Sequence, residues 1–199
     1  MHKVFISFHH ANDQWYKDEL VKLGKRNKVF IDGSVDMGEI PDNWDAQHIR
    51  EYIRDNHLKD TTVTILLVGT ETKNRKHIDW ELFSSMYDGK VNKKSGILVI
   101  NLPSVCCQYH TLCTKEEKEA ILPNQKTWIG INNRAEYERR YPYMPARIID
   151  NLLKKGVSIS VINWDDLSVD KLRLLIDKAY DARANNDYDM SREMRMRNA

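Results

Sequence analysis

Polar side chains follow three apolar segments of the chain. His9 and His10 come directly after the first segment, Asp32 and Ser34 after the second, and Thr70 after the third. In an open α/β sheet, the ligand crevice lies at the carboxyl ends of the strands, where the strand order reverses. Strand ends with bulky polar residues favour contacts to sugar and base, whereas a glycine-rich turn favours phosphate. We therefore expect a polar ligand site at these strand ends.

Glu81 supplies a carboxylate that can face this crevice. It lies in TKNRKHIDWELFSSM, where Ile78, Leu82 and Met86 recur at helical spacing. Glu81 follows Trp80 and falls near the edge between the buried stripe and the solvent side of the helix. The alternative is an ordinary surface glutamate in a position that suits a good helix former.

Sulfur and imidazole side chains cluster in the segment CCQYHTLC. Cys106, Cys107, His110 and Cys113 fall within eight positions, a density that raises the question of a zinc site. Adjacent cysteines seldom both bind one tetrahedral metal, and the sequence contains no second CxxC pair. We expect no metal and interpret the cysteines as thiols packed in a loop of a protein from a reducing compartment.

The glycine patterns of common nucleotide-binding folds are missing. Neither GxGxxG nor GxxxxGK[ST] follows any apolar segment, which argues against a classical NAD dehydrogenase and a P-loop NTPase. A phosphorelay receiver needs acidic residues after its first strand and an aspartate after its third. This chain has His9 and His10 at the first place and Gly69 and Thr70 at the second, so we set that class aside.

Composition narrows the class of partner. The 199 residues include 31 basic and 29 acidic side chains and carry a formal net charge of +2. This balance indicates neither nucleic acid nor a membrane surface as a partner. The start, MHKVFISF, lacks the features of a signal peptide, and the sequence has no run of about 18 apolar residues. We expect a soluble, cytoplasmic protein.

The first half of the chain alternates between predicted strands and helices. Trp15 is expected on the inner face of the first helix. By the right-handed crossover rule, this alternation predicts an α/β fold with a doubly wound parallel sheet of about five strands, in the flavodoxin-like order 2-1-3-4-5. The predicted strands span residues 3–8, 28–32, 61–70 and 95–103, and the predicted helices span residues 12–25, 43–58 and 75–89.

The second half is less regular. Residues 104–145 are expected to form an insertion on the C-terminal side of the sheet, before a helix near 145–155. The segment GVSISVINW predicts the fifth strand, and residues 168–184 a closing helix. We expect one domain over residues 1–184 and a flexible tail over residues 185–199. The closing helix should bury Leu172, Leu175, Ile176 and Ala179.

Two motifs resemble those of TIR domains. KVFISFHHANDQW is similar to the opening of these domains, in which a strand F-I-S-[YF] precedes a polar loop and an acidic helix. TTVTILLVGTETKNRKHIDWELFSSM resembles the TIR-like family typified by the NAD-consuming sensor subunit of the Thoeris anti-phage system, including Arg75 and Glu81. The resemblance covers about residues 1–103. It departs at His77, where the family often has tryptophan.

The resemblance implies that NAD is the substrate and that no separate cofactor is needed. Glu81 would be the catalytic residue, stabilising the oxocarbenium-like ribose that forms when nicotinamide leaves. Phe8, His9 and His10 would line the crevice, and either histidine would donate to a ribose or phosphate oxygen. The alternative for each histidine is a solvated loop residue.

The resemblance also implies roles for the loop after the second strand, which carries Asp32, Ser34 and Asp36. In TIR domains this loop gates the site and makes self-assembly contacts; the alternative is an ordinary mobile loop. Trp44, Thr70 and Trp80 are further candidates for substrate contacts.

Three function classes follow. The first is an enzyme that makes a cyclic or conjugated ADP-ribose signal after a phage-derived trigger and so activates a separate effector protein. The second is a non-catalytic TIR-like scaffold that acts by assembly. The third is a flavodoxin-like binder of another nucleotide, whose expected loop of Ser, Thr and Gly is absent from HHANDQW.

Overall fold

A five-stranded, all-parallel sheet forms the centre of the molecule. The computed structural model describes residues 1–34, 44–90 and 93–198. The strand order is β2-β1-β3-β4-β5, which confirms the predicted flavodoxin-like order. β3 and β4 consist entirely of buried residues, as expected for parallel strands covered on both faces. The strands are β1 (His2–Ser7), β2 (Phe30–Asp32), β3 (Val63–Val68), β4 (Gly96–Asn101) and β5 (Ser160–Asn163).

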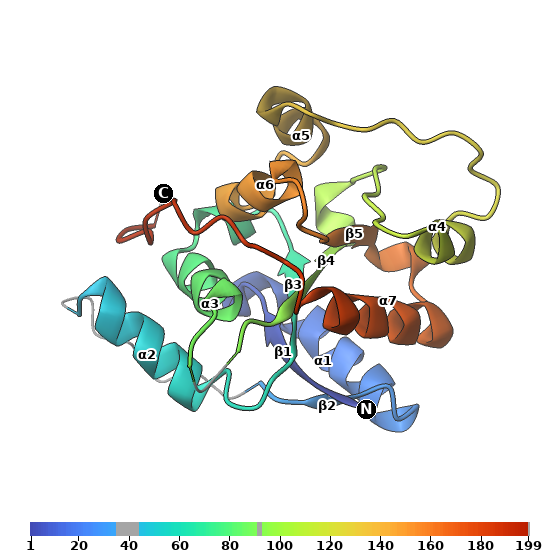
Figure 1. Ribbon diagram of the computed structural model, residues 1–199. Coiled ribbons are helices and arrows are strands. Elements are labelled where there is room, and N and C mark those ends of the chain that lie inside the picture. Colours follow the sequence, from blue (N-terminus) through green and yellow to red (C-terminus); the bar gives the residue numbers. More distant parts are fainter. Residues whose placement is uncertain (35–43, 91–92, 199) are drawn as a thin grey trace.

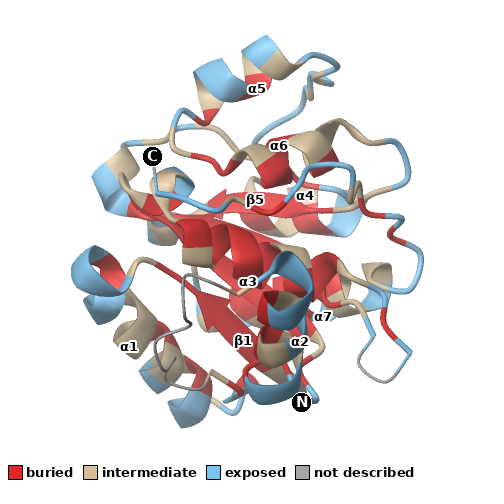
Figure 2. Ribbon diagram, turned by 90° about the vertical axis from the view of Figure 1, so that its left-hand side faces the viewer, coloured by how far each residue is buried: buried red, intermediate tan, exposed pale blue. Residues whose placement is uncertain are grey.

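Helices cover both faces of the sheet (Figure 1). α1 (His10–Arg26) and α7 (Val169–Ala182) pack on one face, against a core that includes Ile6 and Ile65. α2 (Ala46–Asn56), α3 (Lys76–Met86) and α6 (Ala146–Leu153) pack on the other face. α3 is the most deeply enclosed of these helices, and Figure 2 shows it almost wholly in the colour of buried residues.

The buried face of α7 agrees with the prediction, whereas that of α1 differs at one residue. In α7, all four predicted inward residues are buried. In α1, Leu20 and Gly24 are buried, whereas Trp15 is 62% exposed. Trp15 lies five residues before Leu20, about 140° around the helix, so the two cannot share the buried face. The prediction for Trp15 is therefore wrong.

The insertion after β4 runs along the outer edge of the sheet beside β5. Thr111 forms an antiparallel bridge with Val161, and Glu117 accepts a hydrogen bond from Ser160 at 2.6 Å. Ser160 is the first residue of β5, so the insertion reaches the starts of the strands and is not confined to the C-terminal side as expected. It contains α4 (Lys115–Ile121) and α5 (Arg134–Arg140).

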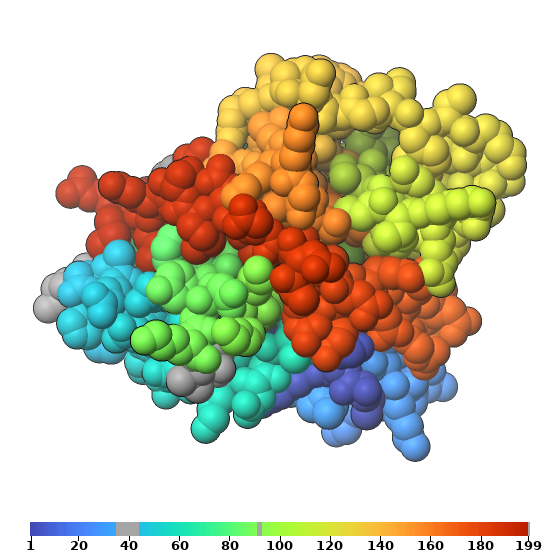
Figure 3. Space-filling model, viewed as in Figure 1, coloured from blue at the N-terminus to red at the C-terminus, as the bar shows by residue number. Residues whose placement is uncertain are grey.

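The C-terminal segment, residues 185–198, packs against the helices instead of extending as the flexible tail that the sequence predicts. The indole of Trp80 donates to the carbonyl of Arg195 at 2.6 Å, and the amide of Arg195 donates to Asp79 at 2.8 Å. Tyr188 and Met194 are buried. Figure 3 shows this segment, in red, on the surface between α6 and α3. Two apolar anchors and backbone hydrogen bonds thus hold a stretch whose composition is mostly polar.

No helix within the described ranges is both long and apolar enough to cross a membrane.

Candidate functional site

The carboxyl group of Glu81 lies at the end of β1, in the part of the sheet where the strand order reverses. Its Oε2 accepts a hydrogen bond from the hydroxyl of Ser7 at 2.5 Å. Ser7 is the last residue of β1 and pairs with Leu66 of β3. β1 lies between β2 and β3 in the sheet. Glu81 is only 3% exposed, which excludes the alternative that it is an ordinary surface glutamate. It occupies the place where ligands of doubly wound sheets bind.

Burial changes the acidity of this carboxyl. Removal from water raises the pKa of Glu81 to about 8, and the hydrogen bond from Ser7 acts in the opposite direction. Glu81 is therefore mostly protonated at neutral pH in this arrangement. Titratable groups whose pKa is shifted by burial concentrate at functional sites, although structural groups can show the same shift.

Ser7 is the site residue that the sequence analysis missed. Side chains of a strand alternate between the two faces of a sheet, so Phe5 and Ser7 face α3 while Phe8 packs on the opposite face with Ile6. Phe8 is 5% exposed within that core and does not lie beside Glu81 as expected. The sequence does contain a signal for Ser7, because it is a polar residue at the end of an otherwise apolar strand, where its side chain is expected to be buried.

The loop after β2 returns to the end of β1. Ser34 accepts a hydrogen bond from the amide of Ile6 at 3.0 Å, next to Ser7. Asp32 in turn accepts from the amide of Ser34 at 3.0 Å, which fixes the start of the loop. The contact to Ile6 brings Ser34 close to the end of β1, whereas Asp32 pairs with Val4 further back along the strand. Asp36 lies outside the described residues.

The two histidines continue from β1 but have different surroundings. His9 is partly buried, and its Nδ1 has no hydrogen-bond partner among the described residues. Burial lowers the pKa of His9, and the positive charge of Arg75 lowers it further. His10 is exposed and stacks on Phe8 with ring centroids 4.3 Å apart. His9 thus lies near Arg75 in surroundings that disfavour its protonated form.

The turn after β3 forms another wall at this edge of the sheet. The hydroxyl of Thr72 accepts from the amide of Gly69 at 2.8 Å, whereas Thr70 is half-buried. Asp13 of α1 packs so closely on Gly69 that a Cβ there would lie 2.5 Å from its carboxylate. Burial raises the pKa of Asp13 to about 6. Thr72 and Asp13, not only Thr70, therefore shape this turn.

The two tryptophans predicted to contact substrate lie in a hydrophobic cluster. Trp80 is 1% exposed and packs with Phe5 and Ile53 between α3 and α2. Trp44 packs at the margin of the same cluster, edge-on to Tyr52 at 5.4 Å. Trp80 is thus part of the core that holds α3 in place.

The cysteine-rich segment belongs to the insertion. Cys106, Cys107 and Cys113 are free thiols, and His110 pairs with Asp166 at 2.8 Å. Across the parts of the chain that the structure describes, no group of three or more His, Cys, Asp or Glu side chains could hold a metal ion.

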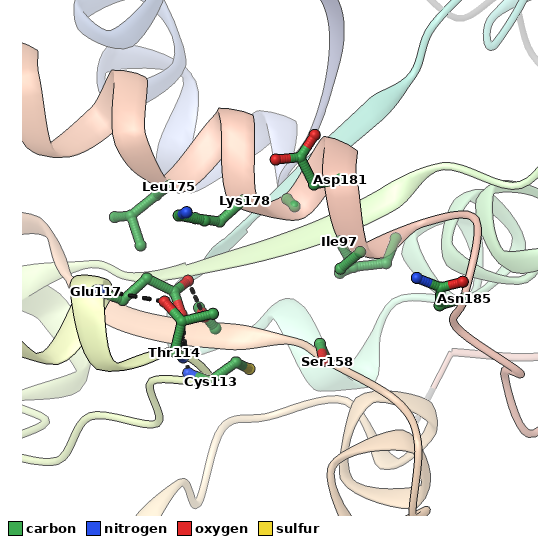
Figure 4. A pocket seen from close by; sticks show the side chains of 12 residues that line it. Ile97, Cys113, Thr114, Glu117, Ser158, Leu175, Lys178, Asp181 and Asn185 are labelled. Atoms are coloured by element: carbon green, nitrogen blue, oxygen red, sulfur yellow. Dashed lines mark hydrogen bonds between the residues drawn. The ribbon is translucent and has the colours of Figure 1, made fainter.

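A cavity of about 300 Å³ lies at the starts of β4 and β5, away from Glu81 (Figure 4). Glu117 lines it, but its carboxylate already accepts from Ser160 and from the amides of Cys113 and Thr114. This carboxylate is therefore a structural group that joins α4 to β5.

The fold and the buried carboxyl on α3 together define a TIR-like α/β domain. In agreement, a family model described as Thoeris protein ThsB, TIR-like domain, matches residues 5–106. The chain belongs to this family, which gives it a role in Thoeris defence alongside a partner effector. A comparison with curated proteins finds no match.

Proposed function

We propose that this protein cleaves the bond between nicotinamide and ribose in NAD, with Glu81 as the catalytic carboxylate. The observation that carries the proposal is the contact between Glu81 and Ser7 at the end of β1. Glu81 lies at the reversal point of a doubly wound sheet, the region where ligands of such folds bind, and this supports its proposed role once a rearrangement exposes it. Membership of the TIR-like family supports NAD as that ligand.

The chemistry requires only one carboxylate. The nicotinamide ring of NAD carries a positive charge and leaves as a neutral base when the C1′–N bond breaks with its electron pair. The ribose is left with oxocarbenium character, which a carboxylate held close by stabilises. Because the leaving group needs no proton, no general acid is required. Water, the adenine or ribose of the same molecule, or an added small molecule then bonds to C1′ through its own electron pair, and a hydroxyl nucleophile releases its proton to solvent.

The raised pKa of Glu81 fits this role. A protonated carboxyl costs less to bury than a carboxylate while the site holds no cation. When a cationic nicotinamide ring approaches, the charge favours loss of the proton, because a nearby opposite charge lowers the pKa of an acid. Glu81 therefore becomes negatively charged when the substrate brings a positive charge for it to stabilise.

The product is proposed to be a cyclic or conjugated ADP-ribose that activates the separate effector. In the structure described, Glu81 is 3% exposed, so substrate contact requires a rearrangement around it. We assign that rearrangement to a phage-derived trigger, with self-assembly of the domain as the accompanying step. The competing function is a non-catalytic scaffold that acts through assembly alone.

The decisive experiment measures nicotinamide release in extracts of phage-infected cells. The cells express the wild-type protein, Glu81→Gln, or the control Glu119→Gln, whose side chain is exposed on α4. We expect infection-dependent nicotinamide and a new ADP-ribose species with wild type and Glu119→Gln, and a loss of about 100-fold with Glu81→Gln.

Equal, background-level NAD loss in all three extracts, with defence retained in Glu81→Gln, supports the scaffold instead. Defence by Glu81→Gln is therefore scored in the same cells. All three proteins are checked for equal expression so that loss of fold is not mistaken for loss of chemistry.

A further inference from the structure

A second cavity, of about 180 Å³, lies where α3, α6 and the C-terminal segment meet. Four of its lining side chains are cations that come from two separate stretches of the chain: Lys73, Arg75, Arg192 and Arg195. Its volume is below that of sites for drug-sized molecules, which start at about 300 Å³. The cavity therefore suits a small, strongly anionic group.

The acidic side chains at the cavity do not cancel this charge. Asp79 is occupied by Arg147, which is fully buried and donates to both carboxylate oxygens, at 2.8 and 3.0 Å. Asp79 also accepts from the amide of Arg195. Glu193 is the other acidic residue of the lining and is exposed to solvent. The cavity walls thus carry a net positive charge.

Two of the guanidinium groups have hydrogen-bonding capacity left. Nη1 of Arg195 and Nε of Arg75 are buried and have no acceptor among the described residues. A buried donor without an acceptor is costly, more so when it is charged. Arg75 also donates through Nη2 to Glu71 at 3.2 Å, so its Nε is the donor left for a ligand. Arg192 donates to Asp150 and Lys73 to the carbonyl of Pro142, so these two side chains contribute charge more than free donors.

The N-termini of two helices add to the positive potential in the cavity. α3 begins at Lys76, directly after Arg75, and α6 begins at Ala146, which lines the cavity. The N-terminus of a helix carries a partial positive charge that favours anions. The first amide of α3 already donates to Asn198, so α3 contributes through its dipole.

We propose that this cavity is a binding site for a phosphate or pyrophosphate group, either free or carried by a nucleotide. Arg195 and Arg75 would donate directly to its oxygens, since charge-assisted bonds from arginine are the strong contacts to phosphate. Such a ligand would join the C-terminal segment to the turn before α3, the helix that carries Glu81. Thr72 and Arg75 belong to the turn that also borders the proposed NAD site, so the two sites are neighbours. Phosphate binding in this cavity does not depend on NAD cleavage.

The test measures binding by calorimetry and thermal unfolding on the full chain. Inorganic phosphate, inorganic pyrophosphate and ADP-ribose are compared with sodium chloride at matched ionic strength. We expect at least one phosphate ligand to raise Tm by about 2–5 °C at saturating concentration. Arg195→Gln should weaken that binding at least about tenfold, since it removes a charge-assisted contact.

Controls separate this site from nonspecific charge and from Glu81. Arg197→Gln removes the same charge from an exposed position two residues away and should bind like wild type. Glu81→Gln should also bind like wild type, whatever the outcome for NAD cleavage. If Arg195→Gln fails to fold, Arg75→Gln provides the same comparison from the other wall of the cavity.

Two results overturn the proposal: no ligand shifts Tm beyond the chloride control, or binding weakens equally in Arg195→Gln and Arg197→Gln. Arg195-dependent binding of pyrophosphate supports a site for the free anion. Arg195-dependent binding of ADP-ribose alone supports a site for a nucleotide-borne phosphate.

Discussion

Ser7 and Glu81, 74 positions apart in the sequence, meet through a 2.5 Å hydrogen bond at the end of the first strand. Glu81 is only 3% exposed, and the Ser7 hydroxyl donates to its carboxyl. The acidity of Glu81 is therefore set by two opposed effects, burial and this hydrogen bond. Four measurable consequences of the packing around α3 follow.

The rate of NAD cleavage should rise with pH. In the proposed reaction the reactive form of Glu81 is the carboxylate, and burial raises its pKa to about 8. Below that pH, kcat/KM for nicotinamide release should increase about tenfold per pH unit and level off above it. The profile is measured on activated protein from pH 6 to 9. A flat profile across this range would show that Glu81 ionises normally in the active state.

The stability of the fold should show the same ionisation without any need for activity. A carboxyl whose pKa rises from its ordinary value near 4.5 to about 8 on folding binds a proton more tightly in the native state. Its contribution to stability is complete at low pH and is lost as the pH rises towards 8. The side chain introduced by Glu81→Gln cannot ionise. The free energy of unfolding of this variant should therefore rise relative to that of wild type between pH 5 and pH 9. Urea unfolding at both pH values measures this; an unchanged difference would contradict the raised pKa.

Ser7→Ala should shift the pH profile as well as lower the rate. The hydroxyl of Ser7 favours the carboxylate form of Glu81, so its removal should move the rise in kcat/KM to higher pH. At pH 7 we expect a loss of about tenfold, in line with a hydrogen bond to a charged group. Ser104→Ala, at an exposed position, is the matched control. A lower rate with an unshifted profile would assign Ser7 a packing role only.

Asp79→Asn should destabilise the protein by about 3–5 kcal/mol, because it leaves the fully buried Arg147 without its counter-charge. The carbonyls of Arg192 and Glu193 still accept from Arg147, so the fold should survive in a weakened form. Chemical denaturation against Asp165→Asn, an exposed control, gives the difference. A loss below about 1 kcal/mol would show that the pair is replaceable.

The sequence predicted the sheet because its signals are local. Apolar β-branched runs such as TTVTILLVGT indicate buried parallel strands, and helical spacing marked the inward face of α7. With one helix between successive strands, the crossover rule leaves few possible orders, and the predicted one is found. The place of Glu81 on the third helix and the family motif around it mark it as the candidate carboxylate in the same local way.

Tertiary structure decided which side chains share the site. Ser7 and Phe8 are neighbours in the chain, but alternation along β1 sends only Ser7 to the face where α3 lies. Trp80, adjacent to Glu81, belongs to the core because α2 and the C-terminal segment cover it. The polar composition of that segment predicts a frayed tail. Hydrogen bonds between Arg195 and the side chains of Asp79 and Trp80, more than 100 positions away, nevertheless fix it on the surface of the fold. Such pairings depend on how layers stack across the whole chain, and no local pattern of residues encodes them.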